Sequence, residues 1–369
     1  MRRFPIALVV ATSTLASCRP ATPACPETPP CSEAPTEAPI LPDTAPSALD
    51  LVTVAQRPDW TDKYAHLNEG DMRFFDIDGL MERYELSRAA AVELQNHYRD
   101  LSRAGEGNEE DWFRVALDRA KRGEFEDRRD VETLKKAPFI VAFDLDETLY
   151  DQYYPANVGT SCHDVTIATP KGPRYLELAH GWETAIRRIR ELGGAVVLFS
   201  ANTDERTIEN LQAIELDGAP LPDHPAISGV LTNSHLILQT KERGTPVVEP
   251  SKDLRVFDET LERVIIVDDN PTRLFQFDNV RVTPALDAEV YCGAAPDSPS
   301  RRTFERNLEQ VVREIEEADS FRRASGVAFA RAFLPYSETG RRWVAMAVAA
   351  GIDQRRAMAW LRDHPEAAD

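Results

Sequence analysis

Cysteine and histidine are scarce in this chain. Its 369 residues include five cysteines and seven histidines. There is no CxxC pair and no cluster of cysteines with histidines, so the sequence gives no indication of a zinc site. The histidines are scattered and none belongs to a nucleophile signature, so the chemistry has to be sought in other residue types.

Basic residues are scarce relative to acidic ones. Lysine and arginine number 43 against 62 aspartates and glutamates, which gives a formal net charge of −19. A balance this acidic argues against binding to the nucleic-acid backbone, and we expect no nucleic-acid partner. It does not argue against phosphate chemistry, because the cations around a site decide that locally.

Long apolar runs are absent except near the N-terminus, where Met1-Arg2-Arg3 precedes a mainly apolar stretch. This pattern predicts a signal peptide over residues 1–17 and not a membrane span. Its end, Leu15-Ala16-Ser17-Cys18, resembles the lipobox of bacterial lipoproteins, in which cleavage precedes a cysteine that carries lipid. The resemblance implies a lipid-anchored protein of the bacterial cell envelope, at the outer membrane and facing the periplasm. An ordinary signal peptide that happens to contain Cys18 is the alternative.

Residues 18–50 are rich in proline, with threonine, alanine, glutamate and serine between the prolines. This composition predicts an extended tether between the lipid anchor and the folded part of the chain. Cys25 and Cys31 lie in this tether, whereas Cys162 and Cys292 lie in the globular part. A bridge between Cys162 and Cys292 is conceivable in an oxidising compartment, but unpaired cysteines or other pairings are equally compatible with the sequence.

Two carboxylates, Asp144 and Asp146, follow the apolar run Phe139-Ile-Val-Ala-Phe143. Such a run is typical of a buried parallel strand, and the carboxyl ends of these strands are where open α/β sheets place their chemistry. Two carboxylates two residues apart can share one divalent cation. The first can also act as a nucleophile and the second as a general acid and base.

Three later segments have the same character. The apolar run 195–199 ends at Ser200-Ala-Asn202, whose hydroxyl and backbone amides can hold a phosphoryl oxygen. Lys252 follows, and the apolar run 264–267 ends in Asp268 and Asp269. Four features therefore follow one another along the chain: a strand that ends in DxD, a strand that ends in serine, a lysine, and a strand that ends in paired acids. This order is specific enough to favour a catalytic site over a purely structural arrangement.

In these motifs the chain resembles the haloacid dehalogenase (HAD) superfamily of phosphatases and phosphotransferases over about residues 137–285. The closer resemblance is to small C-terminal-domain phosphatases and NLI-interacting-factor-like proteins, which have a DLDETL motif, a β-hairpin flap and a KDL segment. Here the flap would be residues 164–169 and 174–178 around a Pro-Lys-Gly turn. Ser200-Ala-Asn202 replaces the usual Thr-Ala-Ser order, and Tyr150-Asp151-Gln152 replaces Val-His-Ser.

The resemblance implies a magnesium-dependent phosphatase. Asp144 would be the nucleophile that becomes phosphorylated, and Asp146 the general acid and base. Mg²⁺ would be held by Asp144, the backbone carbonyl of Asp146 and Asp269, with Asp268 a ligand or in contact with one. The phosphate-binding residues would be Ser200, Asn202 and Lys252. The substrate would be a phosphorylated small molecule or a phosphoprotein.

Strands that alternate with helices predict an α/β fold with a doubly wound parallel sheet, a hairpin flap and flanking helices at both ends. We expect a helical region over residues 51–136, the catalytic core over 137–295 and a C-terminal helical region over 296–369. Residues 218–251 are expected to form an irregular, partly β insert that lies beside the substrate. Pro271 is expected to begin a helix.

A second DxDG sequence, Asp76-Ile-Asp78-Gly79, is expected to be a loop before a helix, because polar residues precede it and cannot form a buried strand. Two other functions remain open. One is a broad acid phosphatase or nucleotidase similar to the class C acid phosphatases, which are envelope lipoproteins with a DLDET motif. The other is a HAD-fold lipoprotein that binds a ligand without catalysis.

Overall fold

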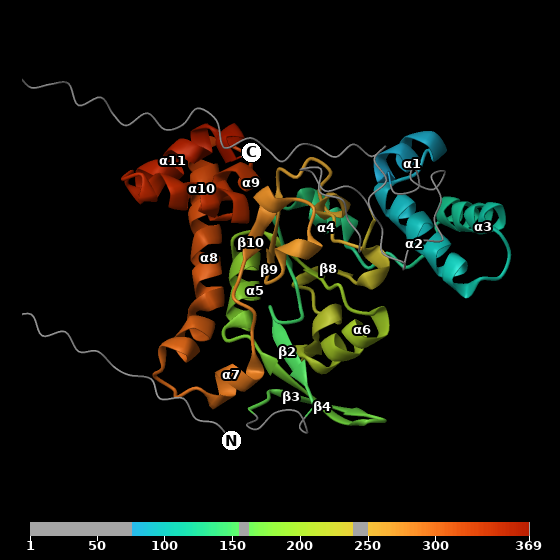
Figure 1. Cartoon of the computed structure of the whole chain (residues 1–369), viewed down its shortest axis with the longest axis horizontal. Coiled ribbons are helices and arrows are strands. Elements are labelled where there is room, and N and C mark those ends of the chain that lie inside the picture. The colour runs from blue at the N-terminus through green and yellow to red at the C-terminus, as the bar shows by residue number, and fades with distance from the viewer. Residues whose placement is uncertain (1–75, 155–161, 239–249, 369) are drawn as a thin grey trace, which may run out of the picture. The chain divides into compact units, whose positions relative to one another are not determined.

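A parallel sheet of five strands forms the centre of the fold, in the order β10-β9-β1-β5-β8 (Figure 1). The structure is a computed structural model that describes residues 76–154, 162–238 and 250–368. The strands are β1 (Ile140–Phe143), β5 (Ala195–Phe199), β8 (Ile227–Leu231), β9 (Val264–Asp268) and β10 (Val280–Val282). All four neighbouring pairs are parallel, and β1 lies in the middle of the sheet.

The apolar runs of β1, β5 and β9 are buried on both faces, as the sequence predicts. Ile140 and Ala142 of β1 belong to one hydrophobic cluster, and Val141 and Phe143 to the other, because successive strand residues point to opposite faces. Helices cover both faces, so the predicted doubly wound α/β fold is confirmed.

One face of the sheet is covered by helices that come after β4 and after β10. These are α5 (Trp182–Glu191), α6 (Asp204–Ala213), α8 (Pro299–Ser325) and α9 (Phe329–Phe333). Their apolar side chains join those of the sheet in one cluster. Helix α7 (Ala288–Gly293) precedes α8, and α10 (Glu338–Ala349) and α11 (Gln354–Asp363) follow with a small cluster of their own. The prediction that residues 301–363 are helical is therefore correct, although short non-helical segments separate the helices.

The other face is covered by helices that precede β1. These are α1 (Ile77–Tyr84), α2 (Arg88–Ala104), α3 (Glu109–Arg122) and α4 (Val131–Lys136). Ser87 caps the start of helix α2, because its hydroxyl accepts from the Ala90 amide, and the helix ends at Gly105 in a left-handed conformation. The described part of residues 51–136 is thus helical, as expected.

The flap is a three-stranded antiparallel sheet in the order β2-β4-β3. The predicted hairpin is present as β3 (Val165–Thr169) and β4 (Gly172–Leu178), with Gly172 at φ 109° in the turn. The third strand, β2 (Tyr150–Tyr153), was not predicted, and it pairs with β4 directly after the turn that follows Asp146. A disulfide joins Cys162, beside the flap, to Cys292 in α7, which settles the pairing that the sequence leaves open.

The prediction for residues 218–251 is wrong for its middle part. Ile227–Leu231 is the edge strand β8 of the central sheet and not a wall beside the substrate. Ser228 and Gly229 interrupt its apolar pattern because residues 128–130 cross this edge: the Asp130 amide donates to the Ser228 carbonyl at 2.8 Å. A Cβ at Gly229 would lie 3.4 Å from the Arg129 backbone. Before β8, β6 (Glu215–Leu216) and β7 (Ala219–Pro220) form a minimal hairpin, and residues 239–249 lie outside the described residues.

Two smaller predictions need correction. The second DxDG sequence is not a loop, because α1 begins inside it: Asp76 caps the helix and Asp78 lies in its first turn. Pro271 does begin a helix, but only a 3₁₀ turn of three residues.

None of the helices in the described ranges combines the length and the apolar character that a membrane span requires.

Candidate active site

The candidate catalytic residues meet at the carboxyl edge of three adjacent strands. Asp144 follows β1, Ser200 follows β5, and Asp268 is the last residue of β9. Since β9, β1 and β5 are neighbours and parallel, their C-terminal ends lie side by side. The fold therefore brings together three motifs that are more than 50 residues apart in sequence.

Lys252 is the centre of the charged cluster. Its side chain is buried, and its Nζ atom donates to Asp144 Oδ1 at 2.5 Å and to Asp268 Oδ2 at 2.6 Å. The backbone of Lys252 is held in turn, because its amide donates to the Arg273 carbonyl and its carbonyl accepts from the Phe275 amide. One lysine thus forms ion pairs with two buried carboxylates, and buried charges are tolerated only when they are paired in this way.

Burial dominates the electrostatics of this cluster. It raises the pKa of Asp144 well above its ordinary value, and Asp268 and Asp146 add to the rise while Lys252 opposes it. Burial alone would lower the pKa of Lys252, but Asp144 and Asp268 together raise it. Burial, with Asp268 beside it, also raises the pKa of Asp269. The site therefore holds excess negative charge that one lysine does not balance, and a bound cation would stabilise it.

Asp146 is surrounded by neutral donors. Its Oδ2 accepts from the Ser200 hydroxyl at 2.9 Å, and its Oδ1 accepts from Asn202 Nδ2 at 3.2 Å and from Gln152 Nε2 at 3.0 Å. Asn210 donates to Gln152 Oε1 at 3.2 Å and so orients that amide. Ser200 and Asn202, expected to bind phosphate, lie where the sequence predicts but donate to this carboxylate in the structure.

A tight turn aims Asp144 and Asp146 in different directions. The Leu145 carbonyl accepts from the amides of the three residues at 148, 149 and 150, and Glu147 adopts a left-handed conformation with φ 61°. The turn leads into β2, and β2 places Gln152 where its side-chain amide donates to Asp146. Gln152 is a site residue that the sequence reasoning missed, although the departure from Val-His-Ser at positions 150–152 was a signal.

Three carboxylates form a group that fits a hard divalent cation. One oxygen each from Asp144, Asp268 and Asp269 lies within 4.8 Å of the others. Thr148 fixes Asp269, because its hydroxyl donates to Asp269 Oδ1 at 3.2 Å and accepts from the Asp269 amide at 3.1 Å. Oxygen ligands of this kind suit Mg²⁺. Thr148 was also missed as a site residue, although it is the threonine of DxDxT.

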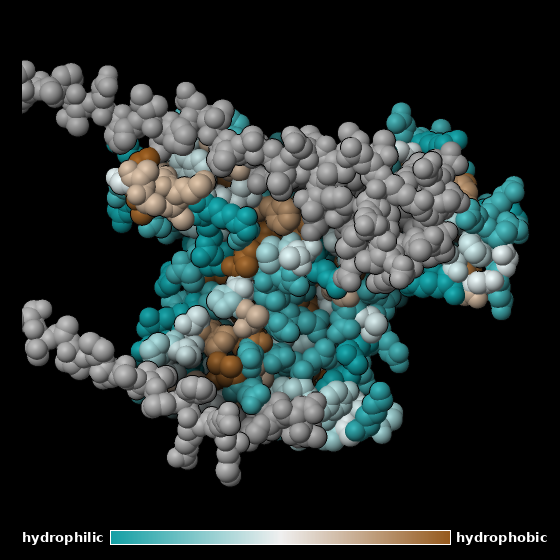
Figure 2. Space-filling model, viewed as in Figure 1, coloured by the Kyte–Doolittle hydropathy of each residue, from teal (hydrophilic) through white to brown (hydrophobic). Residues whose placement is uncertain are grey.

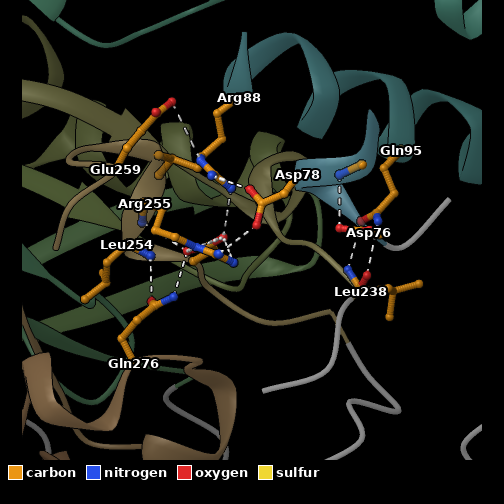
Figure 3. A network of polar contacts seen from close by, with 12 residues as sticks. Asp76, Asp78, Arg88, Gln95, Leu238, Leu254, Arg255, Glu259 and Gln276 are labelled. Atoms are coloured by element: carbon orange, nitrogen blue, oxygen red, sulfur yellow. Dashed lines mark hydrogen bonds and ion pairs between the residues drawn. The ribbon is translucent and has the colours of Figure 1, made fainter. Parts of the chain in front are cut away.

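A polar network holds the segment that carries Lys252 (Figure 3). Asp253, the next residue, is buried and accepts from Arg255 Nε at 3.0 Å and from Gln276 Nε2 at 2.8 Å. Arg88 of α2 lies 3.7 Å from Asp253 and 2.6 Å from Asp78. Since Arg255 also pairs with Asp78 at 3.2 Å, two N-terminal helices are connected to the backbone beside Lys252.

The structure thus gathers all seven predicted residues of the site, Asp144, Asp146, Ser200, Asn202, Lys252, Asp268 and Asp269, at one edge of the sheet. Cys18, the predicted lipidation site, lies outside the described residues.

Comparison with known proteins agrees with this geometry. Residues 139–285, less than half of the chain, match the family of NLI interacting factor-like phosphatases. These residues form a HAD-type phosphatase domain. The match begins one residue before β1 and ends after β10, so it spans the central sheet, the flap and every predicted catalytic motif.

Two solved structures are also similar in part. One is Fcp1, described as an essential RNA polymerase II CTD phosphatase, with 15% identity and a TM-score of 0.36 over 56% of this chain and 72% of that one. The other is the fission yeast RNA polymerase II CTD phosphatase Fcp1 bound to beryllium fluoride, with 13% identity and a TM-score of 0.30 over 60% and 69%. No curated protein sequence matches the chain.

Proposed function

We propose that this chain is a magnesium-dependent phosphomonoester hydrolase that acts through an aspartyl-phosphate on Asp144. The observation that carries the proposal is the double contact of Lys252 with Asp144 and Asp268 at the carboxyl edge of the sheet. The buried Lys252 opposes the rise that burial causes in the pKa of Asp144, and so favours the ionised form that attacks. It also offers positive charge where phosphoryl oxygens would bind.

The two aspartates of DxD have different tasks because their surroundings differ. An oxygen of Asp144 attacks phosphorus, and the bond from phosphorus to the ester oxygen breaks as Asp146 gives that oxygen a proton. Asp146 then takes a proton from water, which attacks phosphorus and releases phosphate and the free carboxylate of Asp144. Ser200, Asn202 and Gln152 hold Asp146 in place for both proton transfers.

The metal would be held by Asp144, Asp269 and the backbone carbonyl of Asp146, with Asp268 a further ligand or in contact with one. When bound, Mg²⁺ would neutralise charge on the phosphoryl oxygens. Thr148 positions Asp269 for this role. Lys252 completes the neutralisation of the phosphoryl charge from the protein side.

The substrate class separates this proposal from its nearest competitor. Three-stranded pairing in the flap and the family match over residues 139–285 favour a relative of the NLI-interacting-factor-like branch acting on a phosphoprotein or a small phosphate ester. A class C-like acid phosphatase or nucleotidase would use the same carboxylates. The complete set of motifs speaks against a module that only binds.

Turnover by the purified protein tests both points. We expect hydrolysis of p-nitrophenyl phosphate that depends on added Mg²⁺ and is abolished by chelation. No turnover at any metal concentration would show that the fold serves binding alone. A panel of phosphopeptides and nucleotides then decides the substrate class: preference for nucleotides would favour the acid phosphatase alternative.

We further propose that the enzyme is anchored to the bacterial cell envelope through lipid on Cys18. The sequence supports this through the signal peptide and the lipobox at residues 15–18. The disulfide between Cys162 and Cys292 supports it independently, because such bonds persist in oxidising compartments and are rare in the bacterial cytoplasm.

A further inference from the structure

A groove lined by five arginines lies beside the end of β10. It has a volume of about 770 Å³ and is bordered by α8, α10 and the residues that follow β10. The arginines are Arg281, Arg306, Arg313, Arg341 and Arg342, and Glu338 is the acidic residue among the lining side chains. Figure 2 shows hydrophilic and hydrophobic side chains next to one another where α8, α10 and β10 meet.

Acidic neighbours neutralise only part of this charge. Arg281 is paired with the buried Glu314, Arg313 with Glu309 at 2.8 Å, and Arg342 with Glu338 at 2.5 Å. Arg306 is exposed and has no ion pair among the described residues, and the hydrogen bond of Arg341 goes to the neutral Val282 carbonyl at 3.4 Å. Burial, with Arg281 beside it, lowers the pKa of Arg341, while Glu314 and Glu338 oppose the shift.

Thr283 adds a neutral donor to the same groove. It lines the groove and is 4% exposed, and its hydroxyl has no hydrogen-bond partner among the described residues. An unpartnered buried hydroxyl is costly unless a ligand or water completes it. Arginines that surround a free hydroxyl form a donor set suited to an oxyanion, and phosphate in particular matches the planar guanidinium.

The groove and the candidate active site share one edge of the sheet. The Thr283 amide donates to the carbonyl of Asp268 at 3.0 Å, so Thr283 directly neighbours the end of β9. Strand β10 is two strands away from β1, which carries Asp144. Because neighbouring strands are about 4.8 Å apart, Thr283 lies roughly 10 Å from Asp144 along this edge.

We propose that the arginine groove binds a second, non-reacting phosphate of the substrate, so that the enzyme prefers esters with two phosphate groups about 10 Å apart. The proposal rests on the phosphatase function proposed above and names its substrate class more closely. The reacting phosphate would lie at Asp144, and the second at Arg306, Arg341 and Thr283.

Kinetics with a matched pair of substrates test it. Hexane-1,6-diyl bisphosphate can span this distance, and hexyl phosphate is the same ester without the second phosphate. We expect the wild-type KM to be about tenfold lower for the bisphosphate, since charge-assisted hydrogen bonds to the second group favour its binding. The double variant Arg306→Ala/Arg341→Ala should lose this preference and keep its kcat and its KM for hexyl phosphate.

The control replaces two exposed arginines of α11 outside the groove, Arg355→Ala/Arg356→Ala, and removes the same charge. An unchanged preference in the groove variant, or an equal loss in the control, would overturn the proposal. If neither ester is hydrolysed by the wild type, the phosphatase function itself has failed. Titration calorimetry with the bisphosphate then still decides the groove: binding that is lost only in the groove variant supports it, and binding unaffected by that variant refutes it.

Discussion

At the scale of single residues, the carboxylates of the site differ in what surrounds them. Asp144 shares a buried lysine with Asp268, whereas Asp146 is held by a hydroxyl and two amides. Lys252 opposes the rise that burial causes in the pKa of Asp144 and so favours the ionised, attacking form, whereas Asp146 is placed to carry a proton to and from the substrate. Position in the turn decides these environments, and the sequence alone does not show them.

The metal site can be tested at Asp269. Asp269→Ala removes one oxygen ligand and leaves the buried Lys252 cluster intact, so we expect magnesium affinity and activity to fall together. Calorimetric titration with Mg²⁺ measures the affinity without relying on activity. Unchanged affinity would assign the metal to Asp268 or another acid instead. The exposed Asp297→Ala serves as a control that should bind Mg²⁺ normally.

The flap contains a carboxyl group that should make stability depend on pH. Burial, with Asp164 nearby, raises the pKa of Glu177 from its ordinary value of 4.5 to about 8, and Arg301 opposes the rise. The folded protein therefore keeps a proton that the unfolded chain releases. Stability from this group is complete below about pH 4.5 and is lost as pH rises through about 8.

Glu177→Gln should remove that dependence. We expect the Tm of the wild type to fall more steeply than that of the variant between pH 5 and 9, roughly the window set by the two pKa values. Thermal unfolding at several pH values measures this, with the exposed Glu215→Gln as a control. Parallel curves for wild type and Glu177→Gln would show that Glu177 ionises normally in the folded protein.

The site residues that could be predicted from the sequence are those that belong to a recognisable motif. Asp144, Asp146, Ser200, Lys252 and Asp268 each stand at a fixed place relative to an apolar run, and the parallel sheet brings those places together. Gln152 and Thr148 were missed because their roles depend on how one turn folds back. The sequence carries two signals, the departure from Val-His-Ser at positions 150–152 and the threonine of the DLDETL motif, but neither shows which carboxylate the residue contacts.

At the scale of elements, the strands that can be predicted from the sequence are those that are buried on both faces. β1, β5 and β9 are uninterrupted apolar runs. Strand β8 is not predicted because Ser228 and Gly229 interrupt its apolar sequence. Both residues contact residues 128–130 where that segment crosses the edge of the sheet. A long-range contact, and not local preference, decides this strand. The Cys162–Cys292 pairing depends in the same way on how the flap meets α7.

Helix α2 should support catalysis through Arg88. Replacing this buried arginine by methionine removes its contacts with Asp78 and Asp253 and loosens the segment that holds Lys252. We expect a loss of stability of about 1–3 kcal/mol from the lost charged hydrogen bond to Asp78 and the lost ion pair with Asp253. We also expect kcat to fall by roughly tenfold or more because the lysine is displaced.

The matched control for Arg88→Met is Arg103→Met, which changes an exposed arginine of the same helix. Arg88→Lys should recover part of the activity, since the charge remains but the planar fork is lost. Steady-state kinetics and thermal unfolding give both quantities. A fully active Arg88→Met protein with lowered Tm would limit the N-terminal helices to a structural role.

At the scale of the whole molecule, the proposed anchor and the active site should be independent. The proline-rich sequence over residues 18–50 predicts a tether that separates them. We expect the mature protein to begin at Cys18 and to carry acyl chains there. Mass spectrometry of membrane-extracted protein checks this, and a mature chain cut elsewhere and unmodified would refute it. Cys18→Ser should release the enzyme with unchanged turnover.

The central claim is that Asp144 is the nucleophile and Asp146 the general acid and base, and trapping the phosphoenzyme tests it most directly. Asp146→Asn keeps the nucleophile but loses both proton transfers, each worth about 10²–10⁴-fold, so the intermediate should form from p-nitrophenyl phosphate and then accumulate. Asp144→Asn cannot form it. After rapid acid quench with labelled substrate, we predict label on the Asp146→Asn protein and none on Asp144→Asn. Label retained by Asp144→Asn would contradict the assignment.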